Sequence, residues 1–225
     1  MPSDPKPAWK KQGDQNVPLL IVCDHASNVV PQSLSNLGVS KETLSTHIAW
    51  DIGARRVAEE IIERVGGCGV FAGYSRLVID CNRPLRNSTL VPTEVDGISI
   101  PGNVSLSRED VGERIEEIYL PYHLLIAETL GAFSERGIKP FVLAVHSCTP
   151  QMNGFNRPWQ IGIAHSKDEQ ASRKILNALK DQQKFEVGDN EPYEVDEDDY
   201  TILSHGMDRG LMHTLIEIRQ DQISD

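Results

Sequence analysis

The sequence has few cysteines, no excess of basic residues and no long apolar run, and each absence excludes a class of protein. The four cysteines are scattered without a C-x-x-C pair, so we expect free thiols in a reducing cytoplasm and no disulfide framework. The sequence contains 22 Lys and Arg residues and 33 Asp and Glu residues. The resulting net charge of −11 argues against nucleic acid and anionic membranes as partners. No stretch approaches the roughly 18 apolar residues of a membrane span, and Met1-Pro2-Ser3-Asp4 does not begin a signal peptide.

A chain of 225 residues is long enough for one domain. Residues 1–16 are polar and contain three prolines, which predicts a loose N-terminal arm before a single domain over 17–225. Short apolar runs alternate with helical patterns in that domain, which predicts an α/β fold with a mostly parallel sheet covered on both faces. The expected strands are 19–22, 70–72, 77–79, 141–145, 160–164 and 213–219.

Ser40 could cap a short helix, and three longer helices are predicted from the spacing of apolar residues and from their capping signals. The first follows Asp51, the second begins at Ser107 and contains Pro121, which should kink it, and the third begins with a capping box of Ser166 and Glu169. Residues 82–103 hold many prolines and glycines and predict a long loop, and residues 189–200 predict an acidic, solvated loop.

Two of the predicted strands end in a histidine. The run 19–22 leads into Asp24 and His25, and the run 141–145 leads into His146. Ligands of open α/β sheets collect at the carboxyl ends of the strands, so both imidazoles should reach the same edge. A single histidine after a strand is usually a structural residue, but two in the same context favour a shared site, such as a zinc centre.

A catalytic zinc needs a third protein ligand, and Asp51 is the main candidate. An acidic residue at the start of a helix is also explained by the helix dipole alone. His47 lies one helical turn before Asp51 and competes for the role, and Glu42 is a weaker rival.

Glu217 lies between Ile216 and Ile218 in a strand that should be at least half buried. Buried carboxylates are rare unless they are paired or functional. Glu217 could form an ion pair with Arg219 on the same face, or it could be a general base whose pKa is adjusted by burial and a nearby metal.

The segment Asp80-Cys81-Asn82-Arg83 follows another apolar run and opens the long loop. Arginine matches a carboxylate with two hydrogen bonds, so Asn82 and Arg83 are candidates for binding a substrate carboxylate, with help from Arg76. An ion pair of Arg83 with Asp80 is the structural alternative. The glycine-flanked loop around His205 could line or cover a pocket.

These segments together resemble the N-formylglutamate amidohydrolase family, from about Val17 to Asp221. The resemblance is carried by Asp24-His25-Ala26-Ser27-Asn28, His47-x-x-x-Asp51, Ser75-Arg76 with Asp80-x-Asn82-Arg83, Val145-His146-Ser147 and Ile216-Glu217-Ile218-Arg219. The family is similar to the zinc-dependent exopeptidases. The resemblance implies a three-layer α/β/α sandwich around a mixed sheet, one Zn²⁺ ion as cofactor, and hydrolysis of an amide in a cytoplasmic step of histidine degradation.

The resemblance also implies roles for individual residues. His25, His146 and Asp51 would bind the metal, Glu217 would be the catalytic base, and Asn82 and Arg83 would bind the substrate carboxylate. The wider superfamily often places its acidic ligand three residues after the first histidine, where this sequence has Asn28. The implied substrate is a small anionic N-acyl amino acid such as N-formylglutamate.

Three other functions stay open on the sequence. The same zinc chemistry could act on a peptide or cell-wall amide, Cys148 beside His146 could serve a metal-free cysteine hydrolase, or the protein could be a non-catalytic anion-binding relative. The cysteine alternative lacks a helix N-terminus that would lower the pKa of the thiol. The sequence gives no indication of the oligomeric state.

Overall fold

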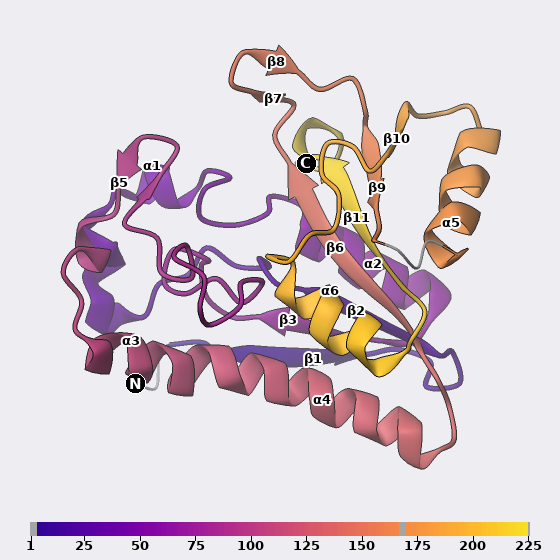
Figure 1. Ribbon diagram of the computed structural model, residues 1–225, viewed down its shortest axis with the longest axis horizontal. Coiled ribbons are helices and arrows are strands. Elements are labelled where there is room, and N and C mark those ends of the chain that lie inside the picture. The colour runs from indigo at the N-terminus through magenta and orange to yellow at the C-terminus, as the bar shows by residue number, and fades with distance from the viewer. Residues whose placement is uncertain (1–3, 167–169, 225) are drawn as a thin grey trace.

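A seven-stranded sheet forms the centre of the computed structural model, which describes residues 4–166 and 170–224 (Figure 1). Its strands are β1 (Ala8–Gln12), β2 (Leu19–Cys23), β3 (Cys68–Ala72), β6 (Phe141–Cys148), β9 (Ile161–Ala164), β10 (Val187–Asp189) and β11 (His213–Arg219). They lie in the order β1-β3-β2-β6-β11-β9-β10. The pairs β1–β3 and β9–β11 are antiparallel and the other pairs are parallel, so the expected mixed, mostly parallel sheet is confirmed.

In the described residues, six α-helices and two short hairpins surround the sheet. The helices are α1 (Lys41–Leu44), α2 (Ala54–Val65), α3 (Arg108–Arg114), α4 (Leu120–Glu135), α5 (Gln170–Asp181) and α6 (Tyr200–His205). The hairpins pair β4 (Glu94–Val95) with β5 (Ile98–Ser99) and β7 (Gln151–Met152) with β8 (Phe155–Asn156). Short 3-10 segments occur at η1 (Gln32–Gly38), which contains a kink, and at η2 (Pro101–Asn103), η4 (Met207–Arg209) and η5 (Gln220–Gln222). The segment η3 (Ile115–Tyr119) is a π-helix.

The two faces of the sheet bury alternate residues of the same strands. In β2, Leu20 and Val22 pack into a core with α4 and α6, whereas Leu19 and Ile21 pack with α2 on the opposite face. Ile216 contacts both the α2 cluster and the cluster of α5, so α5 covers the same face as α2. Figure 1 shows α4 and α6 in front of the sheet and α2 behind it. These layers match the expected α/β/α sandwich, and each fully buried aliphatic side chain contributes about 1.5–3 kcal/mol.

The helix predicted from Ser107 is present but is divided by a π-helical turn. Ser107 accepts a hydrogen bond from the Asp110 backbone N–H at 3.1 Å, and the Asp110 carboxylate accepts one from the Ser107 N–H at 2.8 Å, which confirms the N-terminal cap. The helix is irregular near Pro121, as predicted. The irregular turn lies just before this proline, where the N–H of Leu120 bonds to the carbonyl of Ile115. A proline has no N–H to continue the helical ladder, and the wider turn accommodates this gap.

The structure differs from three of the expectations about local structure. Residues 8–12 are not part of a loose arm, because they form β1 on the edge of the sheet, where Trp9 stacks on Phe71 with ring centroids 5.2 Å apart. Residues 77–79 are buried in a turn and not in a strand, since Val78 N–H bonds to the Ser75 carbonyl at 2.9 Å. The helix expected from Asp51 begins at Ala54. The capping box of Ser166 and Glu169 involves residues 167–169, which lie outside the described residues.

A second apolar core lies beside the sheet and is built from the loops that follow β2 and β3. Leu37, Ile48, Leu77, Ile100 and Tyr119 are all nearly inaccessible to solvent in this cluster. It holds the loops 24–53 and 73–103 against the carboxyl ends of the strands. All four cysteines are free and buried, as expected. Within residues 4–166 and 170–224, none of the helices has the length and apolar character needed to cross a membrane.

Candidate metal centre and active-site pocket

The carboxyl ends of three adjacent parallel strands bring the candidate residues to one edge of the sheet. Asp24 and His25 directly follow β2, His146 lies near the end of β6, and Glu217 lies near the end of β11. Glu217 is paired in register with His146, so the two side chains emerge side by side on the same face. Parallel strands share their carboxyl-terminal edge, which explains why residues far apart in the sequence meet here.

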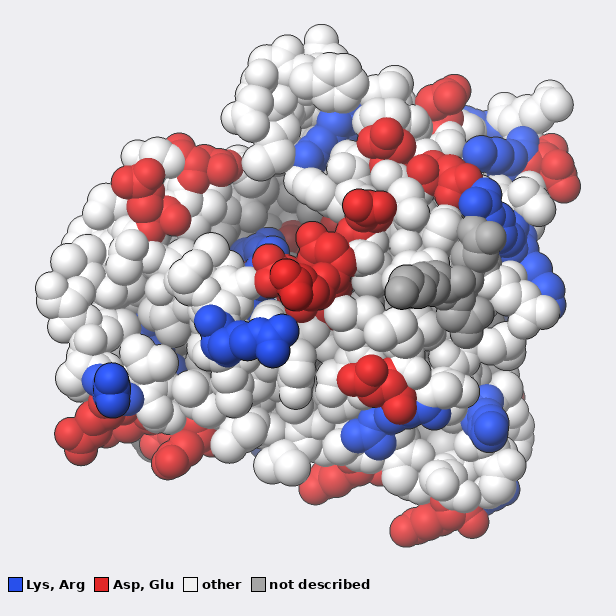
Figure 2. All heavy atoms as spheres, in the orientation of Figure 1, with Lys and Arg blue, Asp and Glu red and all other residues white. Residues whose placement is uncertain are grey.

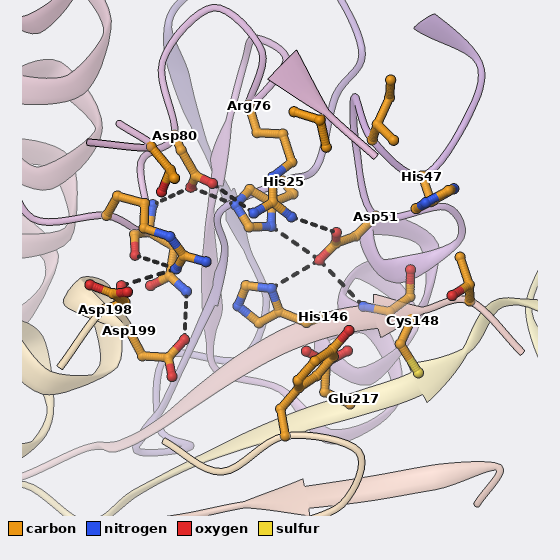
Figure 3. A pocket seen from close by; sticks show the side chains of 18 of the residues that line it. His25, His47, Asp51, Arg76, Asp80, His146, Cys148, Asp198, Asp199 and Glu217 are labelled. Carbon is orange, nitrogen blue, oxygen red and sulfur yellow. Dashed lines mark hydrogen bonds and ion pairs between the residues drawn. The ribbon is translucent and has the colours of Figure 1, made fainter. Parts of the chain in front are cut away.

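Asp51 reaches this edge from the loop before α2 and joins the two histidines (Figure 3). Its Oδ2 atom lies 3.2 Å from Nδ1 of His25 and 2.9 Å from Nδ1 of His146. The backbone N–H of Asp51 also bonds to the His25 carbonyl at 3.0 Å. One nitrogen of each imidazole and one carboxylate oxygen therefore converge, with the three atoms within 4.8 Å of one another, and these three side chains could together hold a metal ion.

A second carboxylate fixes the outer nitrogen of each imidazole. Nε2 of His25 lies 2.8 Å from Oδ1 of Asp80, and Nε2 of His146 lies 3.2 Å from Oδ2 of Asp24. Asp24 in turn accepts a hydrogen bond from the Thr201 hydroxyl at 2.5 Å. Metal-binding histidines commonly have such carboxylate partners, which set the tautomer and the ring orientation.

The electrostatics of this buried cluster suit a cation. Burial by itself favours the uncharged forms, but the carboxylates raise the pKa of His25 and raise that of His146 well above its usual value, while the histidines lower the pKa of Asp51. When both imidazoles are neutral, three buried carboxylates and the Arg76 guanidinium leave two negative charges. A divalent ion would balance them, and two histidines with one carboxylate form a known ligand set of catalytic zinc.

Glu217 is buried beside this cluster and is 9% exposed. Burial raises its pKa to about 7, and the negative charges of Asp51 and Asp199 act in the same direction. Its Oε2 atom is buried and has no hydrogen-bond partner among the described residues. The expected pair with Arg219 does not form, because the Arg219 guanidinium bonds to Asp221 at 2.7 Å. Such a carboxyl, near neutral pKa and free to accept a proton, has the properties of a general base.

Comparison with known proteins supports the fold and decides the family. The family model for N-formylglutamate amidohydrolase matches residues 17–224. The chain belongs to the N-formylglutamate amidohydrolase family. It is therefore an amidohydrolase, as the sequence motifs predicted.

Two solved structures share the fold of this family member. Gene product Atu2144 from Agrobacterium tumefaciens is 32% identical and superimposes with a TM-score of 0.95, with 100% of this chain and 89% of that chain covered. N-formylglutamate amidohydrolase from Ralstonia eutropha JMP134 is 20% identical with a TM-score of 0.72, and the match covers 96% of this chain and 87% of the other. The comparison with curated proteins found no match.

The amidohydrolase has a pocket of about 520 Å³ above the cluster of His25, Asp51 and His146, which we call the candidate metal cluster. Its lining includes the cluster, Glu217 and the predicted substrate residues Arg76, Asn82 and Arg83. Figure 2 shows a hollow in this face with acidic side chains gathered at its mouth and basic side chains beside them. A volume of this size is typical of sites for small molecules.

The residues predicted to bind the substrate differ in how many of their polar atoms are available for that contact. Both polar ends of the Asn82 amide are engaged, since Nδ2 donates to Asp199 at 3.0 Å and Oδ1 accepts from the Thr201 N–H at 3.1 Å. Among the described residues, Arg83 donates only to backbone carbonyls, those of Asn82 at 3.3 Å and Asp198 at 3.0 Å. Its expected ion pair with Asp80 is replaced by one between Asp80 and Arg76, at 2.7 Å.

Three other candidates lie outside the cluster of His25, Asp51 and His146. His47 lines the pocket, but its Nε2 atom lies 2.8 Å from an oxygen of Asp96. Glu42 is an exposed residue of α1. His205 is not among the residues that line the pocket, and its Nε2 lies 3.0 Å from Nδ1 of His123. Of the three alternatives for the third ligand, the structure brings only Asp51 to the two histidines.

Some residues of the site were not singled out by sequence reasoning. Asp80 lies against His25 and Asp24 lies against His146. The sequence could have indicated Asp24 by its place directly before His25, and Asp80 by its place four residues after Arg76. Asp199 belongs to the segment that reads as a solvated acidic loop, yet it lines the pocket. Arg157 lines the pocket as well, and nothing in its local sequence indicates this.

Proposed function

We propose that this amidohydrolase uses a zinc ion to hydrolyse the amide bond of a small N-acyl amino acid such as N-formylglutamate. The observation that carries the proposal is the convergence of His25, His146 and Asp51, with a second carboxylate on the outer nitrogen of each imidazole. A zinc ion bound by these three residues would polarise the amide carbonyl and lower the pKa of a water molecule to about 7.

Residues of the chain would transfer the proton and hold the metal ligands in place. Glu217 is close to neutral pKa and has a buried oxygen without a partner in the described chain, so it can take a proton from the attacking water and deliver it to the leaving nitrogen. Arg76 bonds to Asp80 and lies 3.8 Å from Asp51, so it holds the two carboxylates in place. Asp80 and Asp24 keep the inner nitrogens of the histidines directed at the metal.

Substrate binding is assigned to the loop after residue 80. Within the part of the chain that the structure describes, Arg83 donates only to backbone carbonyls, so its guanidinium keeps a positive charge that a substrate carboxylate can bind. Asn82 supports that loop, and its amide could reach the substrate only after releasing Asp199. An anionic substrate is then drawn by a local positive charge inside a protein with a net charge of −11. The four buried thiols suit the cytoplasmic location that we propose.

The alternatives have less support. Burial and the nearby Glu217 charge raise the pKa of Cys148 to about 12, so this thiol stays protonated at neutral pH and is a poor nucleophile. A peptide or cell-wall amide would need more space than a pocket of about 520 Å³ offers for a long chain.

The test combines metal analysis with a turnover screen. The protein, purified without added metal, is assayed for zinc by mass spectrometry and for hydrolysis of N-formyl, N-acetyl and N-succinyl amino acids, with zinc and with a chelator. We expect about one zinc per chain, turnover of at least one acidic N-acyl amino acid, and loss of turnover with the chelator that added zinc reverses. A protein that binds no zinc and gains no activity from it contradicts the proposal.

A pair of variants locates the metal in the same experiment. Asp51→Asn removes the charge that both histidines contact and should lose zinc and activity together. Asp208→Asn, an exposed residue of η4 outside the pocket, is the matched control and should keep both.

A further inference from the structure

Arg157 is a buried arginine of the pocket that the proposed chemistry does not use. It follows β8 in the hairpin that overhangs the site, lines the pocket and is only 6% exposed. Two further arginines, Arg76 and Arg83, also line the pocket. Burial of a charged group is costly unless an opposite charge or hydrogen bonds compensate it, so the partners of each guanidinium show what it is built to do.

The guanidinium of Arg157 is held by neutral groups. Nη1 donates to the carbonyl of Thr149 at 3.1 Å and to its hydroxyl at 3.3 Å, and Nη2 donates to the hydroxyl of Tyr193. The group also lies over the Tyr193 ring, 4.8 Å from the centroid. Nη2 lies 3.2 Å from the sulfur of Met152. These contacts fix the side chain in one orientation without neutralising its charge.

No carboxylate lies within 4.0 Å of the Arg157 guanidinium in the described parts of the chain. Arg76, in contrast, is 2.7 Å from Asp80 and 3.8 Å from Asp51. No ion pair joins Arg157 to Glu217 in the described parts of the chain, so Arg157 is not the counter-ion of the base either. A fixed, buried guanidinium whose partners are all neutral keeps its positive charge, and this charge is suited to attract and bind an anionic ligand.

Arg157 and Arg83 lie on different sides of the candidate metal cluster. Arg83 bonds to the carbonyl of Asp198, whereas the charge of Arg157 acts on the thiol of Cys148. Figure 3 shows Asp198 on one side of the two histidines and Cys148 on the other. A ligand with two separated anionic groups can therefore contact both guanidinium groups while its amide lies over the cluster.

We propose that Arg157 binds the side-chain carboxylate of an acidic N-acyl amino acid and so sets the preference of the enzyme for acidic over neutral side chains. This inference rests on the proposed function, in which Arg83 binds the other carboxylate. The merely structural alternative is that Arg157 only anchors the β7–β8 hairpin through Thr149 and Tyr193.

The experiment compares two substrates that differ in one group. The values of kcat/KM are measured for N-formyl-L-glutamate and N-formyl-L-glutamine on the zinc-loaded enzyme, on Arg157→Met and on Arg157→Lys. A charge-assisted hydrogen bond contributes enough for the ratio of the two values to fall about tenfold to hundredfold in Arg157→Met. Arg157→Lys, which keeps the charge and loses the fork, should lie between. Arg64→Met, at an exposed position of α2, is the control that should leave the ratio unchanged.

The outcomes separate this inference from the proposed function. A ratio that stays the same in Arg157→Met and Arg157→Lys, with both substrates affected equally, would overturn the role of Arg157 and leave a structural role. If the wild-type protein hydrolyses neither substrate, binding of glutarate is measured by calorimetry on the zinc-loaded proteins. Glutarate that binds at least tenfold more weakly to Arg157→Met still supports the carboxylate site, and equal binding refutes it.

Discussion

The buried pair of His123 and His205 should make the stability of the fold depend on pH below neutrality. His123, in α4, is 8% exposed and His205, in α6, is 4% exposed. Nε2 of His123 donates to the Cys81 carbonyl at 3.0 Å, which leaves Nδ1 of His123 to accept from Nε2 of His205 at 3.0 Å. Both rings are neutral in this arrangement. Nδ1 of His205 is buried without a partner in the described part of the chain, so an added proton would find no acceptor there.

The size of this loss of stability follows from the shifted pKa values of the two histidines. Burial lowers the pKa of His123 to about 4 and that of His205 to about 3, whereas a histidine in an unfolded chain has a pKa of about 6.5. Between these limits the unfolded state binds more protons than the folded state. The stability from the neutral pair is therefore fully present above about pH 6.5 and is lost as the pH falls. At pH 5 the loss is about 2 kcal/mol for each histidine, which is large beside a total stability of about 5–15 kcal/mol.

The assay is urea unfolding at pH 7 and pH 5 with a chelator present, so that metal binding does not contribute. His205→Gln keeps a donor for His123 but removes one titrating group, so its loss of unfolding free energy between the two pH values should be about 2 kcal/mol smaller than that of the wild type. Leu203→Ala, in the same helix, should lower the stability equally at both pH values. If His205→Gln shows the pH dependence of the wild type, the argument from burial is refuted.

Three further predictions address the site and its support. Glu217→Gln should keep zinc bound, as measured by metal analysis, while kcat falls by about 10²–10⁴ because the base is lost. Asp80→Asn should weaken zinc binding by about 10- to 100-fold in a chelator competition, since it holds Nε2 of His25. Gly162→Ala should lower the unfolding free energy by about 1–3 kcal/mol, because its Cβ would lie 2.1 Å from the carbonyl oxygen of Glu191, and urea unfolding measures this.

Each of these predictions has an outcome that contradicts it. Activity retained by Glu217→Gln would remove the residue from proton transfer. Unchanged zinc affinity in Asp80→Asn would show that the His25 ring is held by packing alone. A Gly162→Ala variant as stable as the wild type would mean that the segment around Glu191 can move away without cost.

Much of the central sheet could be predicted from local sequence. The apolar runs at 19–22 and 141–145 and the final strand at 213–219 all form strands of the sheet, because runs of aliphatic residues bounded by polar ones are stable only when buried between two layers. Edge strand β1 was missed, since Trp9 and its polar neighbours do not form an apolar run and only the pairing with β3 organises them. The run at 77–79 was misread because a buried loop has the same composition as a buried strand.

The site was predicted in part. The two histidines and Glu217 could be placed because strand ends determine their position. The choice of Asp51 over His47 could not be made from spacing, because both lie in a loop whose course depends on the second apolar core. The acidic loop was read as solvated, yet Asp199 packs against Asn82 at 3.0 Å, a contact between residues 117 positions apart.

The sequence by itself determined the inner strands of the sheet, but not its edge strands β1 and β10, and it determined which residue types stand at the carboxyl ends of β2, β6 and β11. These features depend on local patterns of apolar and polar residues, which act over a few positions. Only the tertiary structure decided which carboxylate joins the histidines, which carboxylates lie against their outer nitrogens and which pocket arginines have no carboxylate partner among the described residues. Asp24 and Thr201 meet across 177 positions, and Asp51 and His146 across 95. Contacts of this range are set by the packing of loops against the sheet edge, and local sequence does not encode that packing.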